Sequence, residues 1–174
     1  MISLIEESAI AFREQKRLAE SAMIQITDEQ LRTALDPNTN SIAVIIKHMA
    51  GNMVSRWTDF LTTDGDKPDR NRDGEFIDTF ASRDEMMAVW ESGWARLFST
   101  LKTLSDGDLF KHVTIRGEPL TVAGAINRQL THYGYHVGQI ILIARVLAKD
   151  QWQVITIPRG ESETYNQRVR QRKT

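Results

Sequence analysis

The sequence reads Thr131-His132-Tyr133-Gly134-Tyr135-His136-Val137-Gly138-Gln139-Ile140 near its C-terminal end, inside a long segment with the apolar periodicity of a helix. His132 and His136 are four residues apart, so a helix places both imidazoles on one face, one turn apart. This spacing is typical of two side chains that bind one metal ion. Two ligands are too few for a tight site, and we therefore expect another helix to supply a third.

The best candidate for the third ligand is His48, on another predicted helix. That helix has a broad apolar arc, and His48 and Asn52 lie on the polar stripe along its edge. His132 and His136 also border the apolar arc of their own helix. If the two edges face each other, the three imidazoles meet inside a helix bundle, where such folds build metal sites.

The remaining patterns predict an all-α protein. Helical periodicity extends over residues 2–26, 41–61, 82–104 and 121–149. Thr27 and Ser82 begin capping boxes, of which the first opens only a short turn. Two β-prone runs around Gly117 predict a small hairpin. We therefore predict a four-helix bundle with a long loop, residues 63–81, after the second long helix and a short hairpin-like excursion before the last helix.

Composition narrows the class of protein. We expect the 174 residues to form one domain, 1–174, with a basic, flexible tail from about residue 165. The formal net charge of −1 and the lack of a long apolar run predict neither nucleic acid nor a membrane as a partner. The sequence has no cysteine, which excludes disulfides, cysteine-bound metals and a cysteine nucleophile. No signal peptide is recognisable at the start, and we expect a cytoplasmic protein.

Other catalytic motifs are missing from the sequence. Tyr133 stands where the zinc-protease motif has its glutamate, so no general base accompanies the histidine pair. The sequence contains no Gly-x-Ser-x-Gly elbow, glycine-rich phosphate loop or dinucleotide fingerprint. The histidines are therefore the clearest chemical feature of the chain.

Three stretches carry a resemblance to a known group of proteins. They are Ile46-Lys47-His48-Met49-Ala50-Gly51-Asn52, the segment 55–65 with Arg70-Asn71-Arg72-Asp73, and residues 132–140. In these stretches the chain resembles the DinB-like superfamily of bacterial four-helix metalloproteins, which includes the YfiT-type bacillithiol transferases. The similarity extends over nearly the whole chain, to Ile157-Pro158-Arg159-Gly160.

The resemblance implies a four-helix bundle, often dimeric, that binds one divalent metal ion through His48, His132, His136 and water. Zinc or nickel is the expected ion, with iron or manganese as alternatives. It also implies a reaction with a small-molecule substrate and a low-molecular-weight thiol such as bacillithiol, mycothiol or glutathione. Because the chain has no cysteine, any such thiol must be a bound cosubstrate.

Four polar residues are candidates for binding the thiol or the substrate. Asn52, one helical turn beyond His48, could position the thiol or bond to water on the metal. Arg56, Arg70 and Arg72 could bind carboxylates of either molecule. The last two belong to the loop 63–81, whose composition favours a solvated polar loop over a lid that meets an anionic substrate.

We therefore predict a metal-dependent thiol S-transferase. The first alternative is a non-catalytic metal-binding or stress-response protein that dimerises and acts through partners. The second is a hydrolase that uses a metal-activated hydroxide. A homodimer is expected, because Gly134 and Gly138 leave a flat strip on the last helix where a second subunit could pack.

Overall fold

The computed structural model describes residues 3–171 of the chain. Within this range six α-helices and one two-stranded sheet form. The helices are α1 (Leu4–Met23), α2 (Asp28–Arg32), α3 (Ile42–Trp57), α4 (Arg83–Thr103), α5 (Val122–Ala148) and α6 (Ser162–Gln171), and the strands are β1 (His112–Ile115) and β2 (Glu118–Thr121). The chain is therefore mostly helical, as predicted.

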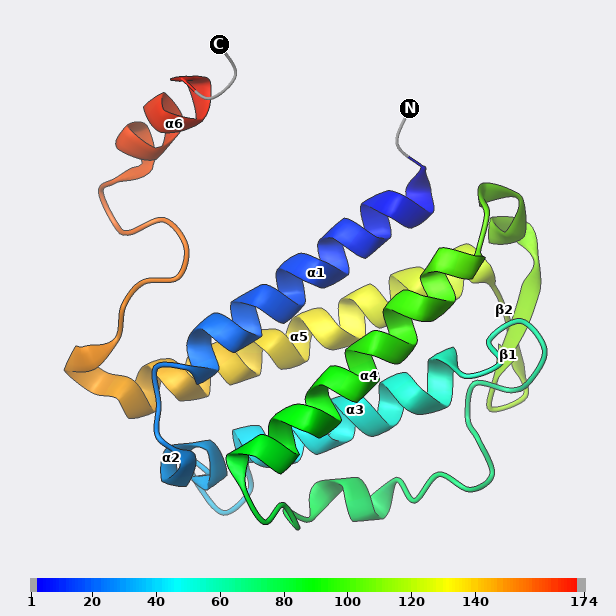
Figure 1. The fold of residues 1–174 in the computed structure, drawn as a ribbon, viewed down its shortest axis with the longest axis horizontal. Coiled ribbons are helices and arrows are strands. Elements are labelled where there is room, and N and C mark those ends of the chain that lie inside the picture. Colours follow the sequence, from blue (N-terminus) through cyan, green and yellow to red (C-terminus); the bar gives the residue numbers. More distant parts are fainter. Residues whose placement is uncertain (1–2, 172–174) are drawn as a thin grey trace.

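Four long helices, α1, α3, α4 and α5, lie side by side (Figure 1). Helix α3 packs against α4 and α5, while α1 packs against α5 and α4. Aromatic side chains fill the space between them, and Trp57, Trp90, Trp94 and Tyr133 are almost fully buried. A side-chain carbon at Gly93 of α4 would lie 2.9 Å from a backbone atom of Ala50, so the close approach of α3 and α4 at this point requires a glycine.

Capping residues begin these helices where the sequence predicts them. Thr27 forms a full capping box at α2, and Ser41, Ser82 and Thr121 accept backbone hydrogen bonds at the starts of α3, α4 and α5. Helix α3 was predicted to reach about residue 61 but ends at Trp57. The next residue is extended and Asp59 has a φ of 47°, so the chain leaves the helix at this point.

The predicted hairpin around Gly117 is confirmed. Strands β1 and β2 are antiparallel, and Arg116 and Gly117 form the two-residue turn with φ values of 58° and 74°. The carboxylate of Asp64 accepts hydrogen bonds from the backbone N–H groups of both turn residues. These bonds tie the loop after α3 to the hairpin.

The loop after α3 is not the solvated segment that its composition favours. It runs along α3, and its short 3₁₀ helix η1 (Asp73–Phe76) packs against that helix. Arg70 and Glu75 have side chains only 6% and 8% exposed, since they form an ion pair with each other. Burial of a charged pair requires such mutual satisfaction, which composition alone does not reveal.

The expectation that a second subunit packs on the strip at Gly134 and Gly138 needs revision at the first of these glycines. A side-chain carbon at Gly134 would lie 3.2 Å from Gln15 Nε2, so α1 of the same chain, not a second subunit, covers this glycine. The tail from about residue 165 is helical as far as Gln171, in α6, and the rest of it lies outside the described residues. In the described part of the chain, no helix combines the length and apolar character needed to cross a membrane.

Candidate metal centre

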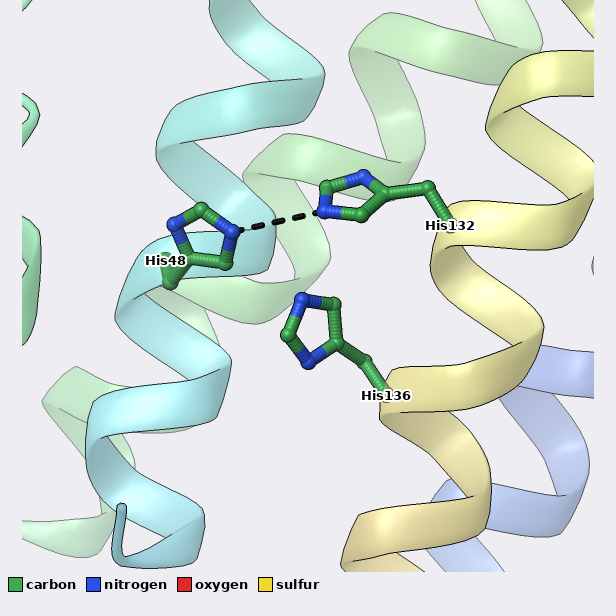
Figure 2. Close-up of side chains that lie close together, drawn as sticks. All are labelled: His48, His132 and His136. Carbon is green, nitrogen blue, oxygen red and sulfur yellow. Dashed lines mark hydrogen bonds between the residues drawn. The ribbon is translucent and has the colours of Figure 1, made fainter. Parts of the chain in front are cut away.

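Three imidazoles converge between α3 and α5, as predicted. His48 points from α3 toward His132 and His136 on α5 (Figure 2). The nearest ring nitrogens of the three lie within 4.8 Å of one another, and Nε2 of His48 is 3.4 Å from Nε2 of His132. Two nitrogen ligands of one tetrahedral zinc ion lie about 3.4 Å apart, so this spacing suits a shared metal ion.

Glu75 fixes the orientation and the proton of His48. Its Oε2 lies 2.9 Å from Nδ1 of His48. Burial alone would raise the pKa of Glu75, but hydrogen bonds from His48 and Arg70 lower it below its ordinary value. Because an ionised carboxylate only accepts hydrogen bonds, Nδ1 of His48 carries the proton and Nε2 presents its lone pair to the site.

Gln139 fixes the orientation of His136 and the position of its proton, as Glu75 does for His48. The side-chain oxygen Oε1 of Gln139 lies 2.8 Å from Nδ1 of His136 and accepts a hydrogen bond from its N–H. Nε2 of His136 is buried and has no hydrogen-bond partner among the described residues. A buried nitrogen lone pair without a partner is unfavourable, and a bound metal ion would satisfy it.

Desolvation keeps the two histidines of α5 uncharged. Burial lowers the pKa of His132 to about 3 and the pKa of His136 to about 4. Both imidazoles are therefore neutral at pH 7, which is the form that binds metals. The donor set fits one divalent ion, held by His48, His132 and His136.

The carboxylate behind His48 is itself held in place by Arg70. Nε and Nη2 of Arg70 donate to Oε1 and Oε2 of Glu75 at 2.7 and 2.8 Å, a two-pronged ion pair. Glu75 also lies against α3, where a side-chain carbon at Gly51 would come within 2.3 Å of Oε1. Such outer partners orient metal-binding histidines and raise their basicity.

A cavity of about 300 Å³ opens beside the histidines. Its lining contains polar and cationic side chains and, among the described residues, no carboxylate. The lining residues are Asn40, His48, Asn52, Arg56, Arg70, Arg72, Phe76, Arg116, Arg128, Gln129, His132, Tyr135, His136 and Gln139. The three histidines thus face a space that a small molecule can enter.

Residues 2–161 match the model of a family described as a protein of unknown function (DUF1572). The chain belongs to the DUF1572 family. This DUF1572 protein is also similar in fold to a solved structure, described as the crystal structure of the conserved protein of locus from Enterococcus faecalis. The TM-score is 0.66 and the sequence identity 16%, over 84% of this chain and 98% of the other. A comparison with curated proteins gives no match.

All four predicted substrate-binding residues line the cavity of the DUF1572 protein, but they differ in what they already bind. Asn52 uses its Oδ1 to accept from Gln129 Nε2 and from the Tyr133 hydroxyl, at 2.6 and 3.0 Å. Arg56 is buried and donates to the carbonyl of Gly65 and to Asp66. These two contacts stabilise the wall of the cavity.

Arg70 and Arg72 also have different surroundings. Arg70 is occupied by Glu75, as described above, whereas Arg72 is exposed at the cavity and lies with Cζ 5.4 Å from the centroid of the Phe76 ring. His112, which does not belong to the predicted ligand set, is exposed on β1. Sequence reasoning missed Glu75, Arg116 and Arg128. The one available signal for Glu75 was Gly51, a small residue one turn from His48 that permits a close approach.

Proposed function

We propose that this chain is a DinB-like four-helix metalloprotein that acts as a metal-dependent thiol S-transferase. One divalent ion, zinc or nickel in preference to iron or manganese, would be held by His48, His132 and His136. The cosubstrate would be a low-molecular-weight thiol such as bacillithiol. The resemblance of the sequence to the DinB-like superfamily supports this assignment, together with the four long helices and the convergence of three histidines between α3 and α5.

The observation that carries the proposal is the way two histidines present Nε2 to an open cavity. Hydrogen bonds to Glu75 and Gln139 hold the proton on Nδ1 of His48 and His136, respectively. Both Nε2 lone pairs therefore point toward the same site, which borders the cavity. A site with three protein ligands and an adjoining cavity is typical of catalysis, whereas a structural site closes its coordination with a fourth protein ligand.

A divalent ion bound there would supply positive charge that favours the thiolate form of a thiol. In the transfer, the sulfur forms a bond to an electrophilic carbon of the substrate, the bond from that carbon to its leaving group breaks, and the thiol proton passes to water. The residues of the chain bind and orient the two reactants. The chain has no cysteine that could compete as nucleophile.

The two alternatives are supported less well. A metal-dependent hydrolase needs a base near the attacking water, and no carboxylate of the described residues lines the cavity.

A non-catalytic, dimeric metal-binding protein is favoured by the surface of α5, where Tyr135, Leu142 and Val146 are exposed. Helix α6, none of whose residues is buried, lies apart from the four long helices (Figure 1). We propose that the protein is a homodimer in either case.

Elemental analysis of the natively purified protein tests the metal site. We expect about one ion per chain, and loss of that ion in His48→Ala but not in His112→Ala.

Thiol transfer is then measured by incubating the metal-loaded protein with bacillithiol and 1-chloro-2,4-dinitrobenzene and following the chloride that this substrate releases. Metal binding without turnover for this or other electrophiles supports the non-catalytic alternative, and full metal occupancy in His48→Ala contradicts the site itself.

A further inference from the structure

The cavity beside the histidines has an excess of positive charge. Five guanidinium groups line it, those of Arg56, Arg70, Arg72, Arg116 and Arg128. They come from α3, from the loop after it, from the β1–β2 turn and from α5. Five arginines from four segments around one small cavity favour an anionic ligand.

Among the described residues, two carboxylates form ion pairs with these guanidinium groups. Glu75 is bound by Arg70 and His48. Asp66 is shared among three arginines, since it lies 3.2 Å from Arg56, 3.3 Å from Arg70 and 3.1 Å from Arg116. Neither carboxylate lines the cavity itself. The ion pairs therefore leave most of the positive charge uncompensated.

Two of the arginines have no ion pair at all within the described chain. The side chain of Arg128 makes no hydrogen bond to another described residue and is exposed on the first half of α5. Arg72 lies over Phe76, and this ring stacks on His48 with a centroid separation of 5.0 Å. Arg72 and His48 therefore contact the same aromatic ring, which places a guanidinium group without an ion pair close to one of the proposed metal ligands.

Arg56 provides a second, independent sign of a ligand. It is 5% exposed, and its Nε is buried without a hydrogen-bond partner among the described residues. A buried guanidinium donor without an acceptor is unfavourable, and Arg56 is one of the residues that line the same cavity. An oxyanion in the cavity would supply acceptors for the guanidinium of Arg56 and for the free arginines.

We infer that the cavity contains an oxyanion-binding site next to the three histidines, formed by Arg72 and Arg128 together with Arg56, for a carboxylate or phosphate group of a small-molecule substrate. That the anion belongs to the substrate rests on the proposed function, whereas anion binding itself does not. A volume of about 300 Å³ lies at the lower end of ligand sites, so the substrate is compact. The guanidiniums would hold its acidic group while the rest of the molecule reaches the histidines.

The inference is tested by calorimetric titration of the full-length chain, both metal-free and zinc-loaded, with inorganic phosphate, succinate and neutral succinamide. We expect at least one anion to bind the metal-free chain, and succinamide to bind neither form. Arg72→Gln and Arg128→Gln should each weaken binding about tenfold or more, because each removes charged hydrogen bonds. Arg96→Gln, an exposed arginine of α4 that does not line the cavity, serves as the control.

The outcomes separate this site from the metal site. Phosphate binding without succinate binding identifies a phosphate ligand, and the reverse identifies a carboxylate. Anion binding that persists in His48→Ala after loss of the metal supports the arginine site even if the proposed function fails. The inference is overturned if no anion binds, if succinamide binds equally well, or if anions bind only the zinc-loaded chain with no effect of either arginine substitution.

Discussion

Oε2 of Glu75 lies 2.9 Å from Nδ1 of His48, although 27 residues separate the two in the sequence. This contact connects the loop after α3 to the predicted metal centre. The other oxygen of Glu75 accepts from Nε of Arg70, so a single carboxylate joins a loop arginine to an imidazole of the predicted metal centre. The loop is therefore part of the site, and disturbing it should change metal affinity.

Replacing Glu75 by glutamine should weaken metal binding while the fold persists. The amide has the same shape but no charge to stabilise the protonated Nδ1 of His48, and losses of 10–100-fold are usual for such partners. Zinc affinity measured by competition with a chelator checks this expectation. Glu118→Gln, at an exposed site on β2, is the matched control. Equal zinc affinity in Glu75→Gln and Glu118→Gln would show that the contact does not act on the metal.

A methyl group at Gly51 should have a similar effect by steric means. In Gly51→Ala the new carbon would lie 2.3 Å from Oε1 of Glu75, so the carboxylate must move away from His48. We expect about tenfold weaker zinc binding or more. Gly138→Ala, where nothing lies within 4 Å, tests the same substitution in a helix without a clash.

The double variant Gly51→Ala/Glu75→Gln sharpens this test. If both changes act through the same contact, the loss of zinc affinity in the double variant should be smaller than the product of the two single losses. Independent, multiplying losses would mean that Gly51 affects the site by another route.

Much of this architecture could be predicted because it is encoded locally. The caps Thr27, Ser41 and Thr121 each act on a backbone N–H group three residues away, and the turn at Gly117 requires a residue that tolerates positive φ. The convergence of three histidines also followed from helical periodicity, since edge positions on two packed helices face each other.

The burial of the loop after α3 could not be predicted in the same way. Arg70 and Glu75 belong to a segment whose composition is that of a solvated loop, and only the long-range contacts of Glu75 with His48 and Gly51 explain their burial. Arg128 was missed for a related reason. An exposed arginine on a helix is ordinary until the fold places the β1–β2 turn and the loop around the same cavity.

The stability of the metal-free chain should depend on pH through His136. Burial lowers the pKa of His136 to about 4 in the folded chain, against about 6.5 in an unfolded one. Between these values the unfolded chain takes up a proton that the folded chain does not. The free energy of unfolding should therefore be unaffected by this group above pH 6.5 and fall as the pH drops toward 4, by at most about 1.4 kcal/mol per pH unit.

Urea unfolding of the metal-free protein between pH 7 and pH 4.5 measures this slope. His136→Gln should have a shallower slope than the unsubstituted chain, because glutamine takes up no proton in this range. His112→Gln, at an exposed histidine on β1, should retain the original slope. Identical slopes for the unsubstituted chain and His136→Gln would contradict the assignment.

The hydroxyl of Tyr133 should matter for stability more than for metal content. It accepts from Trp57 Nε1 at 3.2 Å and Gln129 Nε2 at 2.8 Å, and it donates to Asn52 Oδ1 at 3.0 Å. In Tyr133→Phe the buried indole N–H loses its acceptor, which should lower the free energy of unfolding by about 1–3 kcal/mol.

The histidine ligands remain in place in Tyr133→Phe, so we expect one metal ion per chain by elemental analysis, as in the unsubstituted protein. Urea unfolding measures the loss of stability, with Tyr165→Phe on the exposed helix α6 as the control.

Because the Tyr133 hydroxyl also restrains Asn52, which lines the cavity, a change in thiol affinity without a change in metal content would support the predicted role of Asn52 in binding the cosubstrate. Unchanged stability would mean that Trp57 and Asn52 find other partners, and the network beneath the site would then have no role in holding it together.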